Sequence, residues 1–233
     1  FSDEYSPSLD EQIEGLITSK IRMTELRGVD GINVSDLTPL QASDVHKKLE
    51  SSGIFVSAIG SPIGKIKITD PFEPHLDKLK NTCETADTLF ASRIRVFSFF
   101  IPDGKYDEYK NEVIDRMGKM LDIADEYGVK LCHENEKGIY GDIPERCLEI
   151  HKALPEMKAI FDPANYVQCE VDTLKAWEMI KPYVKYLHIK DALADGKVVP
   201  AGKGIGNVKF ILDDYIRNGG DSVTVEPHLT VFD

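Results

Sequence analysis

The chain has 233 residues, which suits one large hydrophobic core, and its 42% hydrophobic and 29% charged residues are typical of a globular protein. Its formal net charge of −12 argues against nucleic acid and against an anionic membrane as partners, because both require a basic patch on the protein. The four cysteines form no Cys-x-x-Cys pair and no apolar run approaches about 18 residues, so we expect a cytoplasmic protein with reduced thiols and no membrane span.

The expected elements alternate along the chain. The spacing of apolar residues, with a threonine cap at Thr38 and a glycine stop at Gly53 in one case, predicts helices at 9–19, 38–53, 71–90, 106–128, 143–154, 172–183 and 208–219. Short apolar runs between them predict strands at 20–27, 54–60, 93–100, 129–134, 157–162, 184–190 and 222–227. One further strand is expected to end at residues 1–4, before the first helix.

This alternation predicts parallel strands with helices outside, because short helical connections between successive strands force parallel pairing. Seven strands and the one ending at residues 1–4 predict a single (β/α)8 TIM barrel domain over residues 1–233, with its active site at the strand carboxyl ends. An open doubly wound sheet is the alternative, although no Gly-x-Gly-x-x-Gly pattern follows the first strand. The chain stops at Asp233, seven residues past Glu226, so we expect the eighth helix to be absent and the barrel to be incomplete at its C-terminus.

Four consecutive strands end in residues that metals use as ligands. Side chains alternate between the two faces of a strand, so all four are expected to point into the barrel mouth: Glu134, Asp162, His188 and Glu226. Taken singly, each is explained more simply as a helix cap, a loop salt bridge or a core histidine. Their shared direction favours a joint role, because three inward carboxylates repel one another unless a divalent cation lies between them. Such a ligand set favours Mn²⁺, Mg²⁺ or Co²⁺ over a thiolate-type zinc site.

The motifs at these strand ends resemble those of the xylose isomerase-like barrel superfamily, a sugar phosphate isomerase/epimerase group that also includes inosose dehydratase and endonuclease IV. The similar segments are HENEKG, FDPANYVQ, LHIKDA and VEPH, in that order and at strand spacing, with SDEYSP near the start and ELRGVDG at the strand 20–27. The resemblance covers nearly the whole chain. It implies that Glu134, Asp162, His188 and Glu226 bind one divalent metal ion, for which we expect Mn²⁺, with Mg²⁺, Co²⁺ and Zn²⁺ as alternatives.

The resemblance also implies a small-molecule carbohydrate substrate. The metal would chelate the carbonyl and a neighbouring hydroxyl of a ketose, keto-sugar or keto-cyclitol and stabilise an enediolate. Glu134 and Glu226 would flank the sugar, and one would remove the proton that the other returns. Polar residues at strand ends are expected to bind substrate hydroxyls. These residues are Glu4, Arg27, Lys65, Arg95, Asn165, Lys190 and Asp191. For Arg27 and Lys65 the alternative is that they are ordinary surface cations.

Departures from the family pattern leave the reaction open. Asn165 stands where many epimerases of the group have a histidine, three residues after the aspartate, and no arginine follows the His-x-x-Asp element. An isomerase or epimerase is our main hypothesis, and a dehydratase of the inosose type is the alternative. The acidic charge and a total of six histidines disfavour an endonuclease IV-like repair enzyme, and the complete ligand set disfavours a non-catalytic sugar-binding barrel. The sequence leaves a homo-oligomer open.

Overall fold

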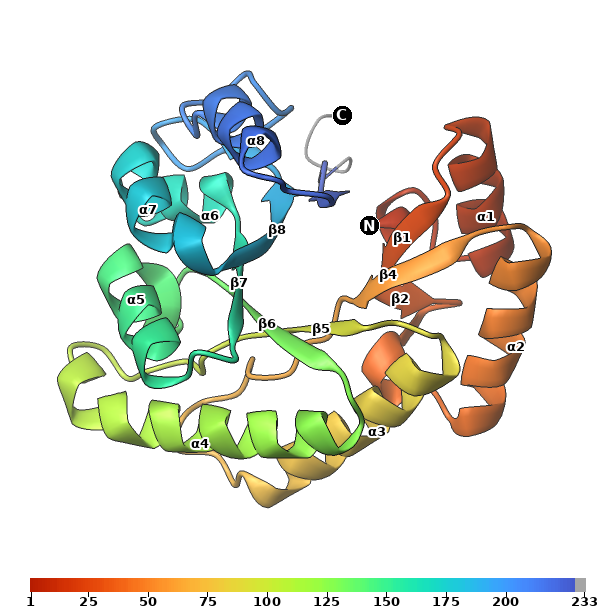
Figure 1. Ribbon diagram of the computed structural model, residues 1–233, viewed down its shortest axis with the longest axis horizontal. Coiled ribbons are helices and arrows are strands. Elements are labelled where there is room, and N and C mark those ends of the chain that lie inside the picture. The colour runs from red at the N-terminus through yellow and green to blue at the C-terminus, as the bar shows by residue number, and fades with distance from the viewer. Residues whose placement is uncertain (229–233) are drawn as a thin grey trace. The chain divides into compact units, whose positions relative to one another are not determined.

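The computed structural model describes residues 1–228, and the chain forms two compact units (Figure 1). The first unit comprises residues 1–63, 71–96 and 119–131, and the second comprises residues 64–70, 97–118 and, within the described range, 132–228. Helix α4 (Tyr106–Glu126) and strand β6 (Lys130–Glu134) contribute residues to both units. The expectation of a single domain over residues 1–233 stays a prediction.

The first unit contains three parallel strands. Their order in the sheet is β1 (Met23–Leu26), β4 (Phe55–Ile59) and β5 (Arg93–Val96). The helices of this unit precede β1 or connect these strands: α1 (Leu9–Thr18), α2 (Pro39–Ser51) and α3 (Glu73–Thr88). An antiparallel pair of short strands and two 3₁₀ helices complete the unit: β2 (Gly28–Val29), β3 (Ile32–Asn33), η1 (Ser2–Glu4) and η2 (Val34–Asp36).

The second unit contains a row of four parallel strands in the order β6, β7, β8 and β11, and this row carries the candidate site. The bounds of the last three are β7 (Lys158–Phe161), β8 (Val184–Ile189) and β11 (Val223–Val225). The α-helices of this unit are α5 (Pro144–Ala153), α6 (Pro163–Gln168), α7 (Thr173–Ile180) and α8 (Val208–Arg217). Short elements lie between them: η3 (Tyr140–Asp142), η4 (Lys181–Tyr183), β9 (Asp191–Ala192) and β10 (Val198–Val199).

One face of β7 and β8 packs against helices, which Figure 1 shows flanking these strands. Phe161 and Leu187 are fully buried in a cluster with Trp177 of α7 and with Ile211 and Tyr215 of α8. Burying an aromatic or large aliphatic side chain contributes about 1.5–3 kcal/mol. This apolar layer fixes which face of each strand points away from the helices, and therefore where the alternating polar residues go.

The register of the strands brings their carboxyl ends level. Phe161 of β7 pairs with Leu187 of β8, and His188 of β8 pairs with Thr224 of β11. The ladder continues past β11, because the Glu226 N–H donates to the Ile189 carbonyl at 3.2 Å. Residues that follow the apolar pairs by one position therefore emerge side by side at the same end of the row.

Most of the expected elements agree with the structure, and capping residues account for where some of the helices begin. Helix α2 begins with the predicted Thr38 cap: the Thr38 hydroxyl accepts from the Gln41 N–H, the Gln41 side chain accepts from the Thr38 N–H, and Pro39 occupies the first turn. The short helix α6 was not predicted; it starts at Pro163 because the Asp162 carboxylate accepts a hydrogen bond from the Asn165 N–H.

One expectation was wrong and another falls outside the described residues. Residues Ser2–Glu4 form a 3₁₀ helix and not the end of a strand, since the Tyr5 N–H donates to the Ser2 carbonyl and closes a turn. Strand β11 is less covered than β7 and β8, and its Val223 and Val225 are 42% and 51% exposed. The segment expected to lack an eighth helix falls largely on residues 229–233, outside the described residues. None of the helices within residues 1–228 combines the length and apolar composition that crossing a membrane requires.

Candidate metal centre

The row of strands in the second unit brings together the four residues predicted as metal ligands. Glu134, Asp162, His188 and Glu226 each offer one ligand atom, and these atoms all lie within 4.8 Å of one another. All four side chains are buried, with exposed fractions between 0 and 6%. We call these four residues the cage. Its three carboxylates and one imidazole fit an oxygen-preferring divalent cation.

The imidazole of His188 links two of the carboxylates. Its Nδ1 lies 2.8 Å from Glu134 Oε1 and 3.8 Å from Glu226 Oε2. Nδ1 is therefore the nitrogen that faces the other ligand atoms, and the same nitrogen would coordinate a metal ion. The cage thus joins the ends of β6, β8 and β11 through a single ring.

A lysine ammonium lies against the cage. Lys190 Nζ is 2.9 Å from Asp162 Oδ2 and 3.1 Å from Glu226 Oε2, and the residue is only 7% exposed. Burial disfavours its charge, but the attraction of Asp162, Glu226 and Glu134 outweighs burial and raises the pKa of the Lys190 ammonium. Both contacts are with candidate metal ligands, and the predicted role of Lys190 in binding substrate hydroxyls stays a prediction.

Crowding of the carboxylates shows in the ionisation of Asp162. Burial, followed by the charges of Glu226 and Glu134, raises the pKa of Asp162 to about 6, although Lys190 opposes the shift. Burial is the largest cause of the shift, and the negative charges of the two glutamates add to it. A divalent cation between the ligand atoms would compensate those negative charges, so the residues present fit a metal ion.

Two asparagines hold the cage in shape. Asn135 clips β6 to β7, because its side chain donates to the Asp162 carbonyl and accepts from the Asp162 N–H, both at 3.0 Å. Asn165 Nδ2 donates to the Asn135 carbonyl at 2.9 Å and lies 3.4 Å from Glu134 Oε1. Sequence reasoning missed Asn135, and the signal was its position directly after the ligand Glu134.

Asp191, the neighbour of Lys190, binds the backbone of the glycine-rich loop 201–206. Its carboxylate accepts from the backbone N–H groups of Ala192, Gly202, Gly204 and Gly206, each at 2.9 Å. A Cβ atom at Gly204 or Gly206 would lie 2.4 Å or 2.7 Å from Asp191 Oδ1, so the loop needs glycine at both positions. The segment 201–206 is therefore a loop wrapped around one carboxylate.

Lys65, also in the second unit, is exposed and forms an ion pair. Its ammonium lies 2.8 Å from Glu136 Oε2 and 4.2 Å from the centre of the Phe97 ring. Glu136 follows the ligand Glu134 by two residues. This ion pair ties the loop after β6 to the segment 64–70 within the same unit.

Three predicted substrate-binding residues lie in the first unit, where they form a group of their own. Arg27 binds Asp3 at 2.8 Å and Glu4 at 3.4 Å. Arg95 donates to the carbonyls of Ser61 and Gly60, and the Phe1 ring lies against both guanidinium groups. A role for Glu4, Arg27 and Arg95 in substrate binding stays a prediction.

Two further histidines neighbour the cage in sequence. His133 is buried on the opposite face of β6, where its Nε2 lies 2.9 Å from Ser98 Oγ, and burial lowers the pKa of His133 well below its usual value. His228 Nε2 lies 3.4 Å from Glu226 Oε1. Neither ring is among the four ligand atoms of the cage.

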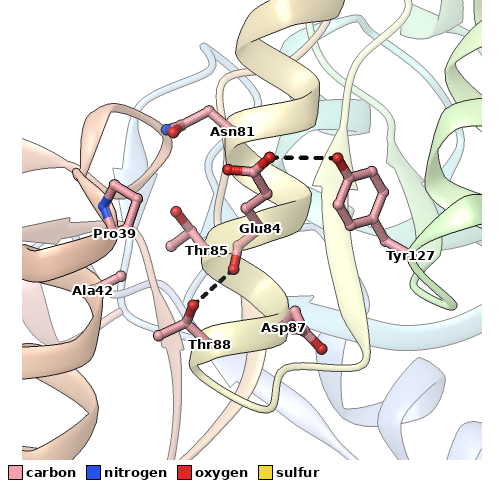
Figure 2. A pocket seen from close by; sticks show the side chains of 8 residues that line it. All are labelled: Pro39, Ala42, Asn81, Glu84, Thr85, Asp87, Thr88 and Tyr127. Carbon is pink, nitrogen blue, oxygen red and sulfur yellow. Dashed lines mark hydrogen bonds between the residues drawn. The ribbon is translucent and has the colours of Figure 1, made fainter.

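A pocket of about 240 Å³ in the first unit offers a contrasting kind of cavity (Figure 2). Its lining residues come from α2, α3 and the chain just after α4: Pro39, Ala42, Asn81, Glu84, Thr85, Asp87, Thr88 and Tyr127. Glu84 accepts a hydrogen bond from the Tyr127 hydroxyl at 3.5 Å, and the Thr88 hydroxyl donates to the Glu84 carbonyl at 2.9 Å. These contacts are those of neighbouring helix surfaces, and the lining contains no histidine or cysteine.

Residues 21–220 match the family described as xylose isomerase-like TIM barrel. The chain belongs to this family. The match confirms the predicted barrel class, decides against the doubly wound alternative, and agrees with the parallel strands and intervening helices of both units. Comparison with curated proteins finds no match.

Several solved structures share the family fold. A D-tagatose 3-epimerase-like protein is 18% identical with a TM-score of 0.78, over 97% of this chain and 91% of the other. The probable 3-DHS dehydratase AsbF of Bacillus anthracis, involved in petrobactin synthesis, is 16% identical with a TM-score of 0.77, over 97% and 90%. The IOLI protein, solved with a zinc atom, is 18% identical with a TM-score of 0.76, over 94% and 83%. At such identities these likenesses show the fold alone.

Proposed function

We propose that the protein is a divalent-metal-dependent sugar isomerase or epimerase that acts on a ketose, a keto-sugar or a keto-cyclitol. The observation that carries the proposal is the cage: three carboxylates and one imidazole from four neighbouring strand ends, buried, with ligand atoms within 4.8 Å of one another. Strand carboxyl ends are where barrels of this class place their catalytic groups.

The metal would be held by Glu134, Asp162, His188 and Glu226. The oxygen-rich ligand set supports Mn²⁺, with Mg²⁺, Co²⁺ and Zn²⁺ as alternatives, and the zinc atom of the IOLI protein shows that a structure of this fold accommodates such an ion. When bound, the ion would polarise a substrate carbonyl and acidify the adjacent C–H bond.

Glu134 and Glu226 are the proposed proton carriers. Glu134 ends β6 and Glu226 follows β11, at the two ends of the row of strands, so their carboxylates approach a substrate from different directions. One glutamate would take the proton from carbon and the other would return it. Asn165 directs its side-chain N–H groups at Glu134 and Asn135 and cannot transfer a proton, so we propose that it positions Glu134.

A dehydratase of the same family is the second candidate. Asn165 supports it, because this position lacks the proton-transferring imidazole that many related epimerases have, and the fold likeness to a probable 3-DHS dehydratase is as strong as that to an epimerase-like protein. In that reaction the same proton abstraction would be followed by loss of a hydroxyl group from the neighbouring carbon. The chemistry of Glu134 and Glu226 would be shared up to that step.

The test is proton exchange at carbon. The protein loaded with Mn²⁺ is incubated in D₂O with a panel of ketoses and keto-inositols, and NMR follows the loss of C–H signals. We expect exchange with at least one member, accompanied by epimerisation or isomerisation, or by loss of water for a dehydratase. Glu126→Gln, an exposed position on α4, is the matched control and should exchange at the wild-type rate. If the loaded protein exchanges no substrate above the protein-free blank, the proposal fails.

A further inference from the structure

Lys190 places a positive charge next to a proposed binding site for a cation. Its ammonium is buried against Asp162 Oδ2 at 2.9 Å and Glu226 Oε2 at 3.1 Å, and these are two of the four residues that would hold the metal. The backbone explains how it gets there. Lys190 follows His188 by two positions on an extended segment, so both side chains lie on the same face.

Lys190 is not free to act as an ordinary surface cation. A lysine that binds substrate would extend its ammonium toward an open cavity, whereas this one is 7% exposed and divides its contacts between two buried carboxylates. Breaking such a buried ion pair by removing one partner is strongly destabilising, because the remaining charges are left without compensation.

The charges of the site balance only when the ammonium and the metal are both present. The cage contributes three carboxylates and a neutral imidazole. One divalent cation alone would leave one negative charge uncompensated in a buried site, and the ammonium alone would leave two. We propose that Lys190 is a resident counter-cation of the cage: it holds Asp162 and Glu226 together in the metal-free protein, remains beside them when metal is bound, and weakens the attraction of the cage for the metal.

Two consequences follow, and they point in opposite directions. Without the ammonium, the metal-free protein should be less stable, because three carboxylates face one another with nothing between them. The same variant should bind metal more tightly, because a divalent cation no longer enters a site that a positive charge has partly neutralised. A lysine that only fills space would lower stability in both states alike, and a lysine that only binds substrate would change neither property.

The experiment compares Lys190→Met with Lys197→Met, a matched removal of an exposed lysine in the loop after β9. Thermal unfolding is measured with EDTA and with saturating Mn²⁺, and calorimetry measures the dissociation constant for Mn²⁺. For Lys190→Met we expect Tm to fall by about 10 °C in EDTA, a larger gain in Tm from Mn²⁺ than in the wild type, and a dissociation constant lower by about tenfold or more. Lys197→Met should match the wild type throughout, and Lys190→Arg, which keeps the charge, should keep wild-type metal affinity to within about threefold.

Equal losses of Tm with and without Mn²⁺, or an unchanged or weaker Mn²⁺ affinity in Lys190→Met, would overturn the proposal. If Lys190→Met does not fold without metal, the double variant Asp162→Asn/Lys190→Met decides, since removing one carboxylate should restore folding and its failure to do so contradicts the idea. The inference rests on the metal site of the proposed function but not on its catalysis. Wild-type protein that binds no Mn²⁺ would defeat the proposed function, while the EDTA comparison would still decide whether Lys190 holds the carboxylates together.

Discussion

Lys190 and Asp191 are adjacent in the chain, but their charges are compensated by different kinds of partner. Lys190 brings a positive charge to a group of buried carboxylates that repel one another. Asp191 accepts hydrogen bonds from three N–H groups of the glycine loop and from the Ala192 N–H. Fixed backbone dipoles give the Asp191 carboxylate a complete and permanent set of partners. Under the proposed function, the cage carboxylates instead rely on two cations, the Lys190 ammonium and a divalent metal ion.

The largest effect should come from removing a cage ligand. Asp162→Ala or His188→Ala takes away one donor and leaves the remaining carboxylates facing each other, so we expect Mn²⁺ affinity to fall by at least about 10³-fold. Calorimetry measures it, with Asp195→Ala as a control in an exposed loop. Unchanged affinity in both ligand variants would show that metal, if it binds at all, is held elsewhere.

Catalysis should separate from metal binding at the two glutamates. Glu134→Gln and Glu226→Gln keep the shape and one coordinating oxygen but lose the proton acceptor, so we expect turnover to fall by at least about 10²-fold while part of the Mn²⁺ binding remains. In D₂O, the variant that keeps the abstracting base should still exchange the substrate C–H without net conversion, and the other should do neither. Wild-type turnover in both variants would mean that these glutamates serve only as ligands.

The Asp191 side of the comparison predicts a loss of stability without a loss of metal. Asp191→Ala leaves three N–H groups of the loop and the Ala192 N–H without their acceptor, and we expect the free energy of unfolding to fall by about 2–3 kcal/mol. Trypsin should also cut faster after Lys203, within the loosened loop. Asp195→Ala, in which only the Lys197 N–H loses an acceptor, should change neither measurement. Mn²⁺ affinity more than about threefold weaker in Asp191→Ala would show that the loop and the cage are not separate.

The smallest expected effect is on the pH dependence of stability and comes from the buried, neutral His151. His151 is buried behind β6, its Nδ1 lies 3.0 Å from the Met157 carbonyl, and burial lowers the pKa of His151 to about 4. The unfolded chain binds a proton below about pH 6.5 and the folded chain does not, so this contribution to stability is complete above pH 6.5 and is lost as the pH falls toward 4. Between pH 7 and 5, urea unfolding of the wild type should lose about 2 kcal/mol more than that of His151→Phe. His46→Gln, on the half-buried face of α2, should keep the wild-type slope.

The cage residues could be predicted because alternation along a strand is a local property. The apolar Phe161 and Leu187 identify the helix-facing side of their strands. Asp162 and His188 come one residue later and therefore lie on the other side. The helix α2 was equally readable, since its cap and proline lie within four residues of each other. In both cases the information that decides the structure is contained in a few neighbouring residues.

The remaining features depend on contacts between distant segments. Alternation along the strand predicts that Lys190 lies on the inner face. Its ammonium contacts Asp162 and Glu226, however, and this position depends on how three strands come together. The same holds for the pairing of Asn135 with the Asp162 backbone and of Asp191 with residues 202–206. The turn at Ser2–Glu4 was missed because polar residues that end a strand and polar residues that begin a turn have the same composition.

The saturated loop around Asp191 also bears on which substrates the protein admits. Glycine-rich loops before a helix often receive a phosphate group through their N–H groups, and in TIM barrels such a site commonly lies near the last strands. Here the N–H groups of Gly202, Gly204 and Gly206 precede α8 but already donate to the protein's own carboxylate. A phosphorylated sugar would have to displace Asp191 to use them, and its charge would meet that carboxylate. If the proposed function holds, we expect the protein to accept free sugars in preference to sugar phosphates at this end of the strand row.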